Sequence, residues 1–176
     1  MIYKPREDSF LLKKEVMKIS KGRIFLDMGS GSGIQAKAAI SSKAKSVIAA
    51  DINEKAVKEL KGQGINAVQS DLFSNIREKF DVIAFNPPYL PEDKREDSES
   101  SLVSSGGKKG DEIILEFLRE AKAHLSKDGI ILLVVSSLTP KKRILALLKK
   151  QKLSYEALSS QKFFFESLEV WKILAR

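Results

Sequence analysis

The sequence contains no cysteine and a single histidine, His124, among its 176 residues. Disulfide bonds and thiolate-bound zinc are therefore excluded, and a histidine-based metal site is not expected because such sites need several ligands. His124 comes directly before Leu125 at the end of a predicted helix, and we interpret it as an ordinary helix-end residue. The sequence thus predicts no metal ion and a cytoplasmic setting.

Long apolar runs are missing too. No stretch approaches the ~20 apolar residues that a membrane span needs, and the residues before Ser9 lack the apolar core of a signal peptide. The apolar fraction of 43% and the charged fraction of 31% are typical of a folded globular chain. We expect one domain over residues 1–176 and no contact with a membrane.

Acidic residues are fewer than basic ones: 23 Asp and Glu stand against 31 Lys and Arg, for a net charge of +8. Such a surface favours association with RNA, ribosomes or an acidic protein, and it also serves solubility alone. A basic helix predicted over residues 141–150 is the candidate face for RNA. The net charge indicates what the protein can associate with, and it does not identify the reaction.

Strand and helix patterns alternate along the chain. Short apolar runs predict strands at 24–28, 46–50, 65–69, 80–85 and 130–135, and amphipathic patterns predict helices at 34–40, 54–60, 111–125 and 141–150. A further helix is expected at 8–19 within an N-terminal segment 1–22, and 155–165 with 168–174 reads as an antiparallel hairpin. The prediction is an α/β fold: a single Rossmann-like, seven-stranded, mostly parallel sheet with helices on both faces and a C-terminal antiparallel hairpin.

Residues 90–110 show neither a helix pattern nor a strand pattern. They hold charges, serine and glycine over about twenty positions, which is long for a plain connection in a compact domain. We expect this segment to be a lid loop over the substrate.

A glycine-rich loop follows the first predicted strand, with Asp27 ahead of Gly29, Gly31 and Gly33. Such a loop lets the backbone approach a ligand at a helix N-terminus. The spacing G-x-G-x-G departs from the dinucleotide pattern G-x-G-x-x-G. The acid would repel a pyrophosphate and would suit an ammonium group, such as that of S-adenosylmethionine.

Two further acids stand at the ends of the next strands. Asp51 ends the second strand, where a carboxylate can accept hydrogen bonds from ribose hydroxyls. Asp71 and Leu72 follow the third strand, where an acid can take an adenine amine and an apolar residue can cover the ring. Because open parallel sheets bind ligands at these ends, the three acids together predict a nucleoside site.

The fourth strand runs into Asn86, Pro87, Pro88 and Tyr89. The prolines hold the backbone rigid and offer carbonyls without competing N–H groups. The Asn86 side-chain oxygen and the Pro87 carbonyl then form an acceptor pair that matches a planar –NH2 group, with Tyr89 placed to stack on it. We interpret Asn86, Pro87 and Tyr89 as catalytic and the whole tetrad as substrate-binding, acting by positioning rather than through a general base.

These motifs together resemble class I S-adenosylmethionine-dependent methyltransferases that modify –NH2 groups. The stretches "YKPREDSFLL", "SSGGKKGDE" and "FFFESLEVWK" resemble the HemK-like release-factor glutamine methyltransferases in their short archaeal and eukaryotic form. The resemblance implies methylation of the glutamine amide in a Gly-Gly-Gln motif of a peptide-chain release factor. It also implies the residues that contact the cofactor: Ser9, Asp27, Gly29, Gly31, Asp51, Asp71, Leu72 and Asn86.

The resemblance to the short members of that family also implies an obligate partner, a small zinc-binding activator protein. The resemblance places this partner on the edge strand that begins at Ile65 and ends at Gln69. A short edge covered by a loop of the chain itself would look the same. Other acceptors also stay open: an exocyclic base amine in RNA or DNA, or a protein lysine. A non-catalytic subunit that only binds the cofactor is the alternative from a different class.

Overall fold

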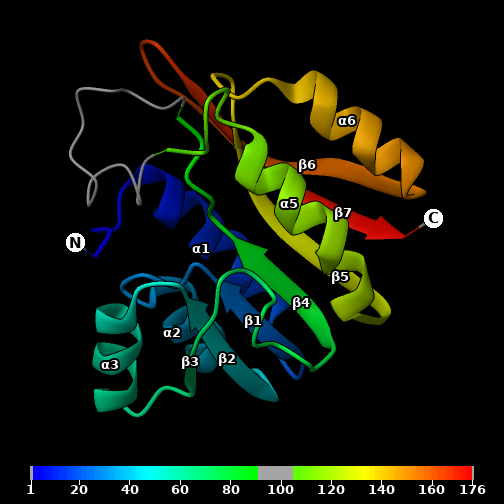
Figure 1. Ribbon diagram of the computed structural model, residues 1–176. Helices are drawn as coiled ribbons and strands as arrows, with labels where there is room; N and C mark the ends of the chain where they lie inside the picture. Colours follow the sequence, from blue (N-terminus) through cyan, green and yellow to red (C-terminus); the bar gives the residue numbers. More distant parts are fainter. Residues whose placement is uncertain (1, 91–104, 176) are drawn as a thin grey trace.

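Seven strands form one sheet in the order β3-β2-β1-β4-β5-β7-β6 (Figure 1). The structure is a computed structural model that describes residues 2–90 and 105–175. The strand bounds are β1 Ile24–Met28, β2 Ser46–Asp51, β3 Ala67–Gln69, β4 Phe80–Phe85, β5 Leu125–Ser136, β6 Leu153–Lys162 and β7 Ser167–Ala175. Strands β1 to β5 pair in parallel, and β7 pairs antiparallel with both β5 and β6. The predicted mostly parallel sheet with a C-terminal hairpin is confirmed.

Helices cover both faces of the sheet because successive residues of the central strands point to opposite sides. The helices are α1 Glu7–Ile19, α2 Ile34–Ser41, α3 Glu54–Gly62, α5 Glu112–Ala121 and α6 Lys141–Lys150, with a short 3₁₀ turn η1 at Lys122–His124. In β1, Phe25 packs in the cluster under α1 and α2, while Leu26 packs in the cluster under α5 and α6. Both side chains are fully buried. The continuous apolar strands of the sequence are therefore buried on both sides.

Several element boundaries differ from the sequence prediction; among them, β6 ends at Lys162 rather than at residue 165, so residues 163–165 lie in the turn before β7. The third strand is only Ala67–Gln69, because the Ile65 N–H bonds to the Leu60 carbonyl at the end of α3 and the Ile65 side chain packs against that helix. The helix predicted to Leu125 ends as α5 at Ala121 and continues as η1. Strand β5 starts earlier than predicted, at Leu125, and its pairing with β4 shifts register between Phe80 and Val82. Local periodicity could not reveal such a bulge, since the partner strand defines it.

Two negative findings concern the part of the chain that the structure describes. Within residues 2–90 and 105–175, no helix is long and apolar enough to cross a bilayer. Over the same residues, no group of three or more histidine or acidic side chains is arranged to hold a metal ion. Most of the predicted lid, residues 91–104, lies outside the described residues.

Candidate functional site

The carboxyl ends of β1 to β4 open into one cavity of about 920 Å³. Its lining draws on α1, the glycine loop, the ends of β2 and β3, and the segment after β4. Every residue that the sequence analysis assigned to the site lines it: Ser9, Asp27, Gly29, Gly31, Asp51, Asp71, Leu72, Asn86, Pro87, Pro88 and Tyr89. The parallel topology therefore brings together residues that are up to 80 positions apart.

The glycine loop turns sharply between β1 and α2. Gly29, Gly31 and Gly33 all have positive φ angles, of 62°, 49° and 74°. A Cβ atom on Gly29 would lie 3.1 Å from the Phe85 ring, and one on Gly33 would lie 2.4 Å from Leu60 Cδ2. Gly29 and Gly33 are thus needed both for their backbone angles and for close packing, Gly31 for its backbone angle alone, and the loop leaves its backbone exposed to the cavity.

Asp51 anchors this loop to β2. Its Oδ2 accepts the Gly31 N–H at 2.7 Å, and its Oδ1 accepts the Asn53 N–H at 2.8 Å. Each oxygen keeps a further lone pair, so the carboxylate can still accept from two hydroxyl groups in the cavity. That arrangement matches the predicted ribose-binding role.

Asp27 lies deep beneath the loop and is 2% exposed. Its Oδ2 accepts the Ala36 N–H at 2.9 Å. Burial raises the pKa of Asp27 from 3.8 to about 7, opposed by the Ala36 hydrogen bond and aided by the charge of Asp51. Because burial disfavours the charged form, a cation in the cavity would stabilise the ionised carboxylate.

Asp71 and Leu72 lie on the rim beyond β3. The Asp71 N–H donates to Ser74 Oγ at 3.1 Å, and the side chain is exposed. Leu72 has a φ of 43°, unusual for a branched residue, and Ser70 Oγ donates to its carbonyl at 2.7 Å. This turn places Asp71 and Leu72 side by side in the lining of the same cavity.

Asn86 is held from the opposite side by α1. Its Nδ2 donates to Asp8 Oδ2 at 3.0 Å. Since the nitrogen is engaged, the Oδ1 atom is left as the free acceptor, and it is buried without a hydrogen-bond partner. A buried acceptor without a donor is costly unless a ligand supplies one. The sequence analysis expected this oxygen, together with the Pro87 carbonyl, to accept from an –NH2 group, and that role stays a prediction.

Asp8 collects three donors besides Asn86. The Tyr3 hydroxyl donates to its Oδ2 at 2.8 Å, and the Ser9 N–H and Oγ donate to its Oδ1 at 2.6 and 3.1 Å. Burial and the neighbouring Asp8 carboxylate raise the pKa of Tyr3, so its hydroxyl stays a donor. The Ser9 carbonyl in turn accepts from Gln35 Nε2 at 2.9 Å.

Tyr89 is coupled to the C-terminal hairpin. Burial, followed by the charges of Asp8 and Glu166 and a hydrogen bond to Glu166, raises the pKa of Tyr89. The phenol therefore remains neutral at any physiological pH. Glu166 itself lines the cavity and accepts from Ser136 Oγ at 2.6 Å.

Sequence reasoning missed several residues of the site, among them Tyr3, Asp8, Gln35 and Glu166. Each lies outside the strand ends that the sheet topology singles out. Tyr3 and Asp8 fall within the opening motif quoted above, which assigned only Ser9. Nothing in the spacing of the sequence links Asp8 to Asn86 or Glu166 to Tyr89, so no local signal could have found these contacts.

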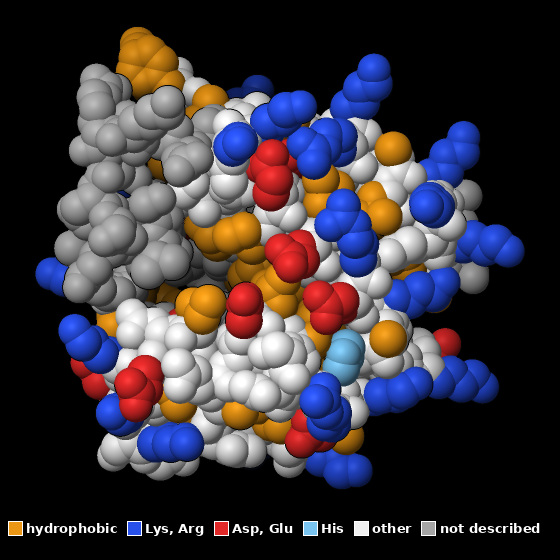
Figure 2. All heavy atoms as spheres, in the orientation of Figure 1, with side chains coloured by type: hydrophobic (Ala, Val, Ile, Leu, Met, Phe, Trp, Pro, Cys, Tyr) orange, Lys and Arg blue, Asp and Glu red, His pale blue; other side chains and the backbone are white. Residues whose placement is uncertain are grey.

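The cavity is acidic although the protein is basic overall. Figure 2 shows acidic side chains on the face over α5, while Lys and Arg side chains gather over α6. The ionisable lining residues are Asp8, Asp27, Asp51, Glu54, Asp71, Glu116 and Glu166, against Arg6 and Lys55. S-adenosylmethionine carries a sulfonium and an ammonium group, so the cavity fits it in charge as well as in its hydrogen-bond acceptors.

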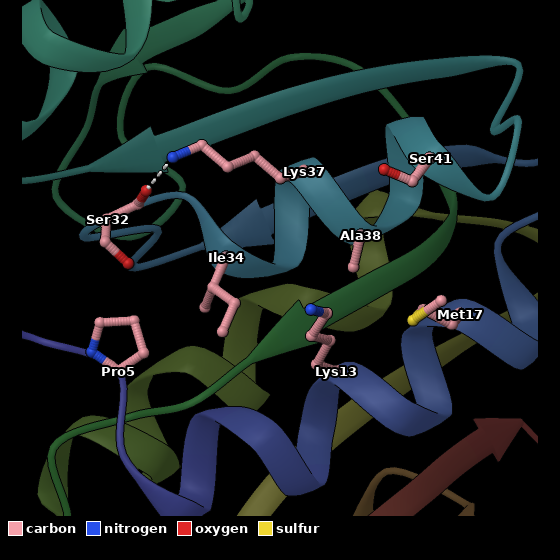
Figure 3. A pocket seen from close by; sticks show the side chains of 8 residues that line it. All are labelled: Pro5, Lys13, Met17, Ser32, Ile34, Lys37, Ala38 and Ser41. Carbon is pink, nitrogen blue, oxygen red and sulfur yellow. Dashed lines mark hydrogen bonds between the residues drawn. The ribbon is translucent and has the colours of Figure 1, made fainter.

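A second, smaller pocket of about 380 Å³ lies beside the first, between α1 and α2 (Figure 3). Lys13 and Met17 of α1 face Ile34 and Ala38 of α2 across it, while the Lys37 side chain runs the other way, where its Nζ donates to the Ser32 carbonyl at 2.9 Å. Its lining includes no acid and none of the residues at the strand ends. We therefore assign the chemistry to the larger cavity.

Comparisons with known proteins agree with this site. The family model described as the methyltransferase small domain matches residues 8–164. A chain of Methanocaldococcus jannaschii, named as a candidate protein N5-glutamine methyltransferase, is 38% identical over 98% of this chain and 92% of its own length. The eRF1 methyltransferase catalytic subunit mtq2 of Schizosaccharomyces pombe is 26% identical over 98% of this chain and 88% of its own length.

A solved structure extends the similarity to three dimensions. The Mtq2–Trm112 complex of E. cuniculi, which is responsible for the methylation of the translation termination factor eRF1, contains a chain that superposes on this one with a TM-score of 0.81. The two chains are 26% identical, and the match covers 99% of each. The chain thus has the same overall fold as this methyltransferase subunit.

Proposed function

This chain belongs to the methyltransferase small domain family, in its HemK-like branch of S-adenosylmethionine-dependent protein-glutamine methyltransferases, and we propose that it methylates the Gly-Gly-Gln glutamine of a peptide-chain release factor. The resident co-substrate is S-adenosylmethionine, which supplies an electrophilic methyl group when bound. The protein contributes position and charge.

The observation that carries the proposal is the buried, unpartnered Oδ1 of Asn86. A glutamine amide presents two N–H donors and a nitrogen whose lone pair is delocalised. Asn86 Oδ1 would accept one N–H and the Pro87 carbonyl the other, holding the nitrogen toward the glycine loop. Tyr89, neutral and half-buried, would stack on the planar amide. Such holding raises the rate by orientation and by electrostatic stabilisation.

Residues at the ends of the strands would bind the cofactor in one half of the cavity. Asp51 would accept from the ribose hydroxyls, and Asp71 with Leu72 would hold the adenine. The exposed backbone of Gly29 and Gly31 would face the amino-acid portion, with Asp27 compensating its positive charge and Ser9 closing that side. Residues 90–110 would act beside the substrate, as expected from their place directly after Tyr89.

The test is a methylation assay with peptide mass spectrometry. Wild-type protein, S-adenosylmethionine, the release factor of the same organism and its candidate activator should yield methyl on the Gly-Gly-Gln glutamine. Asn86→Ala should lower kcat by roughly 10²- to 10³-fold while S-adenosylmethionine binding is largely kept. Gln63→Ala is the matched control, since Gln63 is an exposed amide at the end of α3. An Asn86→Ala protein with unchanged function would instead support the non-catalytic subunit.

A base amine in nucleic acid is the second candidate acceptor, favoured by the charge of α6. Lys142, Lys149 and Lys150 are exposed along that helix. Two of its other cations are already paired: Lys141 lies 2.9 Å from Glu169 and Arg143 lies 3.1 Å from Asp111. Transfer to RNA in a parallel reaction, without methyl on the release factor, would establish this alternative.

A small protein partner is the second part of the proposal, and the edge position of β3 supports it. The Asn66 carbonyl and the Ser70 N–H bond to β2, so the alternating residues Ala67 and Gln69 direct their backbone groups to the open side. Asn75 Nδ2 already donates to the Gln69 carbonyl at 2.8 Å and partly caps this edge. We propose that a zinc-binding activator adds a strand at β3, replacing that side chain.

Size-exclusion chromatography and thermal melting test this pairing. Co-expression with the activator should raise the melting temperature and give a complex of two different chains. A stable monomer that methylates the factor at full rate alone would rule the activator out.

A further inference from the structure

The turn between β6 and β7 lies at the same sheet edge as the Asn86–Tyr89 segment. β7 runs antiparallel to β5, with Ser136 at the end of β5 opposite Leu168 near the start of β7. β4 ends alongside β5 because these two strands are parallel. The turn residues 163–166 therefore stand beyond the carboxyl end of the sheet, on the substrate side of the cavity rather than the cofactor side.

This turn presents an aromatic tip formed by Phe163, Phe164 and Phe165. Phe164 is 92% exposed and Phe165 84% exposed, and Phe163 is 37% exposed. The rings of Phe164 and Phe165 meet edge to face, with centroids 4.5 Å apart. Figure 1 shows the β6–β7 hairpin projecting beyond the rest of the domain, and Figure 2 shows a protruding cluster of hydrophobic side chains at its end. Single exposed apolar residues are ordinary, but an adjacent aromatic pair of this exposure is typical of a contact surface.

The aromatic tip is held in a defined place relative to the cavity. The Phe163 N–H donates to the Glu166 carbonyl at 2.7 Å, which closes the turn. The Glu166 carboxylate is fixed by Ser136 Oγ at 2.6 Å and by the hydrogen bond with Tyr89. One residue thus links the tip to the tyrosine that faces the substrate.

We propose that the aromatic tip docks an apolar segment of the protein substrate beside the glutamine that is methylated. The inference rests on the proposed function and adds the surface by which the protein substrate is recognised. Asn86 and Glu166 line the same cavity, so a protein segment that presents a glutamine to Asn86 would lie close to the turn that carries the tip. Two phenylalanine rings offer a large contact area at a small cost in conformational entropy, as anchor residues do.

The charge beside the tip favours a protein over a nucleic acid as the occupant. Phenylalanine rings can stack on bases, but nucleic-acid sites pair such rings with a positive groove for the phosphates. Here Glu166, in the turn itself, and Glu116 line the adjoining cavity. These carboxylates would repel a phosphate backbone, whereas they leave an apolar peptide segment unaffected.

The test is a double variant, Phe164→Ser with Phe165→Ser, assayed with intact release factor under the conditions of the methylation assay. We expect KM for the factor to rise about tenfold or more, with kcat at saturating factor and S-adenosylmethionine binding by calorimetry unchanged. The double variant to leucine should keep most of the affinity, because it retains apolar area. Ile40→Ser is the matched control: Ile40 is 49% exposed but lies near the far end of α2, away from this edge.

Each other outcome overturns the inference. An unchanged KM in the serine variant would show that the tip does not dock the substrate. A change from dimer to monomer at unchanged KM would assign the tip to a second copy of the chain, and reduced RNA binding at unchanged KM would assign it to nucleic acid. The proposed function fails separately, when the wild-type protein itself places no methyl on the factor, and the inference then falls with it.

Discussion

The side-chain amide of Asn86 donates to the carboxylate of Asp8 over 3.0 Å, although 78 residues separate the two in the chain. This contact decides which end of the Asn86 amide is engaged and which is left without a partner, because a carboxylate accepts and cannot donate. Asp8 is therefore a positioning residue for the acceptor that the proposed function needs.

Removal of Asp8 should lower turnover more than binding. In Asp8→Ala the Asn86 amide can rotate, so we expect kcat to fall roughly ten- to hundredfold with little change in the affinity for S-adenosylmethionine. Asp8→Asn should recover part of the loss, since its oxygen can still accept from Asn86. Steady-state kinetics and calorimetry measure the two quantities. Glu15→Gln is the control, because Glu15 is equally buried on α1 but lines neither pocket; a similar loss of kcat there would mean that α1 packing alone is at work.

Substitution of Asp51 should weaken binding of the cofactor rather than binding of the methyl acceptor. Asp51→Ala removes the acceptor of the Gly31 and Asn53 N–H groups, which should lower the free energy of unfolding by about 1–3 kcal/mol. We also expect S-adenosylmethionine binding to weaken by at least tenfold, an order of magnitude set by about 1.4 kcal/mol of lost interaction.

Asp81→Ala is the matched comparison for Asp51. Asp81 also accepts a backbone N–H, from Ile24, and a hydroxyl, from Ser126, but at the opposite end of the sheet. It should lower stability to a similar extent without changing calorimetric affinity. Equal losses of affinity in both variants would argue against a ribose-binding role for Asp51.

Asp27 should make the protein without cofactor less stable as pH rises. Its pKa in the folded state is about 7 against an ordinary 3.8, so between these values the folded state holds a proton that the unfolded state releases. The contribution of this group to the free energy of unfolding is then largest below pH 4 and declines up to pH 7. Denaturant titrations of wild type and Asp27→Asn across this window should differ in slope, the variant lacking the decline.

Cofactor binding should show the opposite dependence on pH. A cationic ligand favours ionised Asp27, so the affinity for S-adenosylmethionine should be about tenfold lower at pH 6 than at pH 8, from the ionised fractions at a pKa near 7. Asp27→Asn should bind weakly at both pH values. An affinity that does not change with pH in the wild type would contradict a direct electrostatic role for this carboxylate.

Gly33 should be the least replaceable glycine of the loop. Gly33→Ala combines a positive φ with a Cβ that would lie 2.4 Å from Leu60 Cδ2. Gly22→Ala has the same backbone strain with nothing within 4 Å, so it should lose about 1–2 kcal/mol of stability from strain alone. Gly33→Ala should lose about 1–3 kcal/mol more from overpacking. Thermal or chemical denaturation compares the two, and equal losses would show that Leu60 moves aside freely.

The sequence showed which polar residues stand at the ends of the strands, because this depends only on local patterns. Each of Asp27, Asp51, Asp71 and Asn86 lies within two residues of the end of an apolar strand, and parallel strands bring such ends to one edge whatever the details of packing. The glycine loop and the double proline are likewise defined by backbone angles of neighbouring residues. These features predicted the fold and the residues that line the cavity.

Only the tertiary structure decided how these residues are oriented. The bonds from Asp8 to Asn86 and from Glu166 to Tyr89 join elements whose separation in the chain carries no periodic signal. Similarly, the capping of the Gln69 carbonyl by Asn75 and the register shift in β5 depend on the partner strand or loop that happens to lie alongside. The sequence by itself determined which groups meet at the carboxyl edge; the packing of α1 against the sheet determined which atom of Asn86 is left without a hydrogen-bond partner.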